Sequence, residues 1–195
     1  KAIHMAVEDL FSATNFILEN ADQFEVSPDN IVISGSSAGA ISVMQAEYEI
    51  ANSTSWASVL PEGFNYAGVM SFSGAILSRE RKVDYKKVPC ATLMLHGTSD
   101  ELVPYNQIKV FKLGFFGGGK LVERFKKFGL NYNMYHFTGY GHEIAGSMGT
   151  TFDLQDKFLK TNVMQKKMRI VEAWIDDPNV YKGSGPQSRK ELYGN

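Results

Sequence analysis

Apolar residues follow two different spacings along the chain, and these spacings predict helices and strands in alternation. An apolar residue at every third or fourth position predicts an amphipathic helix, and a short run rich in β-branched and aromatic residues predicts a strand. The predicted helices cover residues 2–21, 38–51, 105–113, 121–128 and 154–175, and the predicted strands cover residues 31–34, 66–72, 91–95 and 132–137. In the last helix, methionines are expected to fill the core. This alternation favours a mostly parallel sheet with crossover helices.

A Gly-Ser-Ser-Ala-Gly segment, Gly35 to Gly39, lies between a predicted strand and a predicted helix. This is the context of a nucleophile elbow, in which a serine sits on a sharp strand-to-helix turn. We expect Gly35 and Gly39 to remove clashes with the backbone and to leave Ser37 exposed at the start of the helix, where amide dipoles favour negative charge. The alternative is a turn in which Ser37 is only an N-terminal helix residue.

Two later loops carry an acid and a base. Asp100 lies in Leu-His-Gly-Thr-Ser-Asp-Glu-Leu-Val-Pro, directly after the strand at 91–95, and His142 lies in Gly-Tyr-Gly-His-Glu, after the strand at 132–137. Open α/β sheets place functional groups just past the ends of their strands. A serine nucleophile requires a base, and the base requires an orienting carboxylate. Ser37, Asp100 and His142 therefore form a candidate catalytic set.

With these motifs in the order nucleophile, acid, base, residues 1–175 resemble the α/β-hydrolase superfamily. The acid and histidine segments resemble the corresponding loops of its esterases and dipeptidyl-peptidase-like members. The resemblance implies an α/β-hydrolase fold, with residues 1–175 as the C-terminal portion of the catalytic domain. Residues 176–195 are polar and are expected to form a C-terminal tail.

Each candidate has an expected role. His142 would take the proton of Ser37 and return it to the leaving group, while Asp100 would hold the imidazole tautomer and stabilise the imidazolium. The backbone amide of Ala38, the residue after the nucleophile, would contribute to the oxyanion hole. Glu101 is an alternative acid. The alternative for Asp100 is that it serves only as a turn residue.

The other three histidines are expected to be structural. His4 falls in the first predicted helix, His136 falls inside a strand, and His96 precedes the acid loop. We expect His96 to pack or form hydrogen bonds beneath the site rather than to act as the base.

Composition narrows the function classes. The chain of 195 residues is 44% hydrophobic and 12% aromatic, which suits one domain with a buried core. Its formal net charge of −1 gives no electrostatic case for binding nucleic acid or an acidic membrane surface. No apolar run is long enough for a membrane span, and no signal peptide is visible. Cys90 is alone, which excludes an internal disulfide and leaves the compartment open. The sequence predicts neither a metal nor a cofactor.

A glycine-rich segment, Gly114 to Lys120, matches the first seven positions of a phosphate-binding P-loop. Leu121 stands where a serine or threonine would ligate magnesium, and no predicted strand precedes the segment. We therefore expect a flexible break between two helical stretches.

The first predicted strand already carries the nucleophile. In the resembling family, several strands precede it, and a loop after an early strand donates a second amide to the oxyanion hole. No such motif precedes Ser37. We therefore expect this chain to be the C-terminal portion of a longer hydrolase, with the N-terminal half supplied by a missing segment or another chain.

The form of the elbow and the short connection between Phe72 and Ala91 resemble the carboxylesterase and acetyl-xylan or feruloyl esterase branch. The resemblance implies cleavage of small acyl, acetyl or feruloyl esters, including esters carried on carbohydrate. A serine peptidase of the dipeptidyl-peptidase-like type and a catalytically silent binding module are the alternatives. Aromatic residues in connecting segments are expected either to line the substrate site or to pack against the core: Trp56, Phe64, Phe115 and Phe116.

Overall fold

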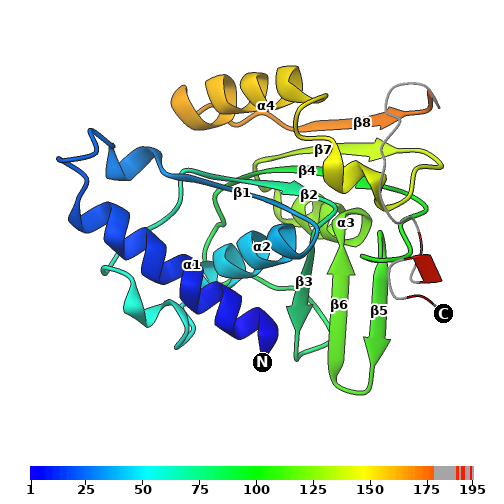
Figure 1. Ribbon diagram of the computed structural model, residues 1–195, viewed down its shortest axis with the longest axis horizontal. Helices are drawn as coiled ribbons and strands as arrows, with labels where there is room; N and C mark the ends of the chain where they lie inside the picture. The colour runs from blue at the N-terminus through cyan, green and yellow to red at the C-terminus, as the bar shows by residue number, and fades with distance from the viewer. Residues whose placement is uncertain (178–187, 189, 192–193, 195) are drawn as a thin grey trace.

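A five-stranded parallel sheet forms the centre of the molecule (Figure 1). The computed structural model describes residues 1–177, 188, 190–191 and 194. The strand order is β1-β2-β4-β7-β8, so that β1 and β8 form the two edges. The strands are β1 (Val32–Ser36), β2 (Gly68–Phe72), β4 (Ala91–Gly97), β7 (Tyr132–Phe137) and β8 (Val171–Ile175). The predicted mostly parallel sheet with crossover helices is confirmed.

Helices cover both faces of this sheet. One apolar cluster joins Ile33, Val69 and Met94 to the first three helices, and a second joins Leu93 and Phe137 to the fourth. Successive strand residues point to opposite faces, so the central strands are apolar on both sides. The helices are α1 (Ala2–Glu19), α2 (Ala38–Ala51), α3 (Gly118–Phe128) and α4 (Phe152–Phe158), with short helical turns at Pro28–Asn30, Ala57–Val59, His142–Gly146 and Leu159–Met164. Within this described part, no helix combines the length and apolar character needed to traverse a bilayer.

A second, antiparallel sheet projects from the first, at the bottom of Figure 1. It has the order β3-β6-β5 and comprises β3 (Ala75–Ser78), β5 (Gln107–Val110) and β6 (Leu113–Gly117). The helix predicted at 105–113 is therefore wrong. Phe111 adopts a positive φ of 50° and turns the chain back, so that Leu113 pairs with Val110. Pairing of β6 with β3 completes the sheet, and this long-range contact overrides the local helical pattern.

The glycine-rich segment also differs from expectation. It runs from β6 directly into α3, so it is a strand-to-helix junction rather than a break between helices.

The last predicted helix, 154–175, is wrong beyond Met164. Lys166 adopts a positive φ of 50°, and residues 171–175 then form β8, which pairs in parallel with β7. Met164 and Met168 are 72% and 62% exposed, so they do not fill the core. Val171 and Trp174, which fall within the predicted helix, lie instead on β8. Most of the predicted tail lies outside the described residues, and its boundary stays a prediction.

Candidate active site

Ser37 occupies the turn between β1 and α2. Its backbone has φ 53° and ψ −117°, and its amide donates a hydrogen bond to the carbonyl oxygen of Phe72 at 2.9 Å. A positive φ is uncommon for a residue other than glycine and marks strain that the surrounding structure must hold in place. The turn lifts the Ser37 side chain away from the sheet, at the N-terminus of α2.

The two glycines of the motif have different roles. A Cβ added to Gly35 would lie 2.3 Å from the carbonyl carbon and oxygen of Gly39, so Gly35 is required by close backbone approach. A Cβ added to Gly39 would meet nothing within 4 Å, leaving its own helix aside. The expectation that Gly39 also removes a clash is wrong. The backbone of Gly39 forms one side of the close approach to Gly35, but a side chain at position 39 would have room.

The structure brings Ser37, His142 and Asp100 together from three separate segments. Ser37 Oγ lies 2.8 Å from His142 Nε2, and His142 Nδ1 lies 2.8 Å from Asp100 Oδ2. Ser37 is at the elbow, Asp100 follows β4, and His142 begins the helical turn after β7. These distances lie within hydrogen-bond range, so a proton can pass from the hydroxyl to the imidazole without a change of geometry.

Asp100 is held by its own loop. Its Oδ1 accepts hydrogen bonds from the amides of Leu102 and Val103, both at 2.9 Å. Burial favours a higher pKa for Asp100, but hydrogen bonds from His142, His96 and the Val103 amide outweigh burial and hold the pKa well below its usual range. The carboxyl group is therefore ionised at neutral pH. Glu101, the alternative acid, is exposed.

The remaining three histidines have partners other than Ser37. His4 packs on Trp56, with ring centroids 4.2 Å apart. His136 stacks on Trp174, and its Nδ1 shares a hydrogen bond with the Tyr105 hydroxyl at 2.6 Å. Burial lowers the pKa of His136 below its usual range. His96 forms hydrogen bonds beneath the acid loop, as expected.

Ala38 is exposed and is the first residue of α2. The first N–H groups of a helix have no intrahelical acceptor, so the Ala38 amide can donate to an oxyanion formed at Ser37. The Ser37 amide cannot serve in this way because it is bonded to Phe72.

The turn role given as the alternative for Asp100 is present beside its contact with His142. The amides of Leu102 and Val103, two and three residues later, donate to its Oδ1, as is common for an aspartate in a turn. In the part of the chain that is described, no three histidine, cysteine, aspartate or glutamate side chains gather as metal ligands would.

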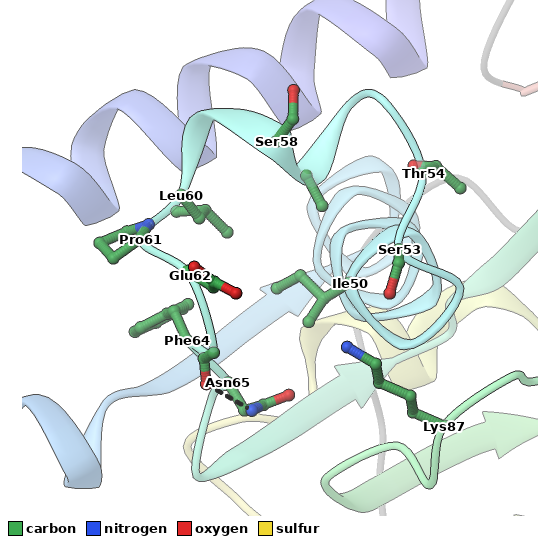
Figure 2. Close-up of a pocket in the computed structure, with 12 residues that line it drawn as sticks. Ile50, Ser53, Thr54, Ser58, Leu60, Pro61, Glu62, Phe64, Asn65 and Lys87 are labelled. Carbon is green, nitrogen blue, oxygen red and sulfur yellow. Dashed lines mark hydrogen bonds between the residues drawn. The ribbon is translucent and has the colours of Figure 1, made fainter.

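The aromatic candidates do not gather around Ser37. Phe64 lines a hollow of about 440 Å³ near the far end of α2, into which Glu62 and Lys87 point from facing walls (Figure 2). Ile50 in this hollow lies about 20 Å along the helix from Ser37, at 1.5 Å per residue. Phe116 is buried in the core. This hollow is therefore separate from the candidate active site.

Comparisons with known proteins support the fold. No family model and no curated protein matches the chain. The solved structures similar to it include esterase PE8, with a TM-score of 0.52 and 19% identity over 81% of this chain and 62% of that chain. They also include a Mycobacterium tuberculosis puromycin-hydrolyzing peptidase, with a TM-score of 0.52 and 16% identity over 86% of this chain and 27% of that chain. The chain has the α/β-hydrolase fold. It spans less than two thirds of the length of either structure.

Proposed function

We propose that this chain carries the catalytic residues of a serine hydrolase that cleaves carboxylic esters through an acyl-enzyme on Ser37. The observation that carries the proposal is the unbroken hydrogen-bond path from Ser37 through His142 to Asp100. The order of the three residues and the strained elbow support it. A silent binding module would not need all three groups in contact.

The geometry supports a two-step reaction. Ser37 Oγ attacks the ester carbonyl carbon while its proton passes to His142 Nε2, and the carbonyl oxygen gains negative charge beside the Ala38 amide. The imidazolium, paired with Asp100, then protonates the leaving alcohol as the ester C–O bond breaks. Water attacks the acyl-serine with His142 as base, which releases the acid and restores Ser37.

The proposed substrates are small acyl, acetyl or feruloyl esters, including esters on carbohydrate. The short connection from β2 to β4, which holds only β3, leaves no room for a large cap, and likeness to an esterase supports the same choice. A serine peptidase is the second candidate, because the other similar structure is a peptidase.

We further propose that an N-terminal part, from the same gene or another chain, completes the oxyanion hole. The edge position of β1 and the exposure of Ala38 and Gly39 support this proposal. One amide is an incomplete hole, and losing one donor typically costs about 10²- to 10³-fold in rate.

Intact mass spectrometry with a fluorophosphonate probe tests the function. We expect one adduct on the wild type and on Ser42→Ala, a control serine on α2, and none on Ser37→Ala. An unlabelled wild type would contradict the assignment of Ser37 as a nucleophile activated by His142 and Asp100 in this chain. Comparing acetyl, feruloyl and aryl esters with aminoacyl anilides then separates an esterase from a peptidase.

A further inference from the structure

His96 is held on both sides of its ring directly beneath the acid loop. Its Nδ1 accepts a hydrogen bond from the Gly118 amide at 3.3 Å. Its Nε2 lies 3.1 Å from the Val103 carbonyl oxygen and 3.4 Å from Asp100 Oδ2. The side chain is only 1% exposed, so water does not compete for these contacts.

The partners decide which nitrogen carries the proton. A proton on Nδ1 would point at the N–H of Gly118, so the neutral ring carries its proton on Nε2. That N–H faces two acceptors, the Val103 carbonyl and Asp100 Oδ2. His96 therefore donates toward the acid rather than accepting from it.

His96 Nε2 lies next to the one acceptor position of the Asp100 carboxylate that its hydrogen bonds leave open. An ionised carboxylate has about four lone-pair sites. The amides of Leu102 and Val103 occupy two sites on Oδ1, and His142 occupies one on Oδ2. With His96 beside the remaining site, the rotation of the carboxylate is set from both sides, and Oδ2 points at His142.

The glycine-rich junction places the donor. A Cβ added to Gly118 would lie 3.1 Å from His96 Nδ1 and 3.0 Å from Met134 Cε, so a larger residue would push the ring or Met134 by a few tenths of an ångström. The junction between β6 and α3 thus packs beneath the acid loop. This packing role explains glycine in a segment whose sequence otherwise suggests phosphate binding.

We propose that His96 is a positioning residue for the acid of the active site, with its tautomer set by the Gly118 amide. This inference rests on the proposed serine hydrolase function. Without His96, Asp100 Oδ2 loses the N–H that limits its rotation, so the carboxylate can turn away from His142. A carboxylate turned away from the imidazolium stabilises it less.

The test compares His96→Leu, which removes the donor, with His96→Gln, whose Nε2 can donate from nearly the same place. We expect kcat/KM for an aryl acetate to fall about 10- to 100-fold in His96→Leu, as for loss of a hydrogen bond to a charged group. The acid limb of its pH–rate profile should move to lower pH. His96→Gln should recover most of the rate and the original profile.

A second pair of variants addresses the junction without altering His96. Gly118→Ala should displace the ring and lower the rate, whereas Gly149→Ala, whose added Cβ meets nothing within 4 Å, should not. Thermal unfolding followed by circular dichroism keeps all assays below the melting transition of each variant.

A rate and profile in His96→Leu equal to those of His96→Gln would overturn the proposal. If the wild type does not react with the fluorophosphonate probe, the proposed function fails, and the deshielded proton NMR signal of the Asp100–His142 hydrogen bond then decides about His96. Loss of that signal in His96→Leu alone would support the positioning role, and its survival in both variants would refute it.

Discussion

The acid side and the nucleophile side of the candidate site differ in burial and in hydrogen bonding. On the acid side, Asp100 is buried and accepts hydrogen bonds from two backbone amides and from His142, with His96 close by. On the nucleophile side, Ser37 is half-buried, and Ala38 and Gly39 are exposed beside an edge strand.

This difference bears on the proposed function. The proposed proton path uses groups held by β4, β7 and the loops that follow them, all within this chain. Stabilisation of the proposed oxyanion would depend on further donors beside the exposed elbow. We therefore expect substitutions on the acid side to change the hydrogen bonds that hold Asp100 and His142. Substitutions at the elbow should change the turn that holds Ser37.

The largest expected effect is that of Asp100→Asn. The amide reverses hydrogen bonding at Oδ2 and favours the wrong tautomer of His142, so kcat should fall about 10⁴-fold. Steady-state hydrolysis of an aryl acetate measures this fall. Glu101→Gln changes the adjacent exposed carboxylate and should leave the rate unchanged; a similar fall in both variants would mean that Asp100 is not the acid.

The same substitution should cost stability in a pH-dependent way. The folded-state pKa of Asp100 lies below its unfolded value, so the ionised carboxylate stabilises the fold above about pH 4. That stabilisation is lost as the pH falls toward the folded-state pKa. Urea unfolding of wild type and Asp100→Asn should give a gap in free energy that is constant near neutrality and narrows below about pH 4.

At the elbow, Gly35→Ala should be severe and Gly39→Ala mild. The added Cβ at position 35 would overlap the backbone of Gly39, so we expect a loss of about 3 kcal/mol in the free energy of unfolding, together with loss of activity. Gly39→Ala should cost less than about 1 kcal/mol and keep the elbow active. Equal losses in urea unfolding would contradict the assignment of the close approach to Gly35.

Glu47 lies on α2, the helix that follows the elbow, and its pKa shifts in the opposite direction to that of Asp100. Its carboxylate accepts a hydrogen bond from the Cys90 amide at 2.8 Å, but burial dominates and raises its pKa to about 7. Because the folded-state pKa exceeds the unfolded value of about 4.5, the wild type loses stability as the pH rises from about 4.5 to 7.

Glu47→Gln should remove this loss and be more stable than the wild type by about 3 kcal/mol at pH 8, with little difference at pH 4. Urea unfolding at the two pH values measures it, with Glu62→Gln at an exposed site as control. A pH-independent difference would show that the carboxylate is not the titrating group.

The smallest effect is expected for Tyr105→Phe. The variant loses the hydrogen bond between the Tyr105 hydroxyl and His136 at the end of the acid loop, for about 1 kcal/mol of stability. Because the amides of Leu102 and Val103 still hold Asp100, the rate should change less than about threefold. A large loss of kcat at unchanged stability would mean that this outer contact also sets the position of the acid.

The spacing of apolar residues correctly predicted those elements whose apolar side chains pack on the face that this spacing indicates. The helix at 38–51 and the strand at 132–137 were predicted with their observed bounds. The patterns failed at 105–113 and 165–175, where apolar residues fit either a helix or a strand. There, pairing with β3 and β7 decided the outcome, because a partner strand satisfies backbone groups that a marginal helix would satisfy locally.

The sequence by itself determined the fold class and indicated Ser37, Asp100 and His142 as candidate site residues, because each lies in a short motif just past a predicted strand. Tertiary structure decided that Gly35 and not Gly39 is crowded, that Asp100 rather than Glu101 faces inward, and that His96 donates toward the acid. These outcomes depend on contacts between segments far apart in the chain. Such contacts exist only after the strands have paired and the loops at their ends have met.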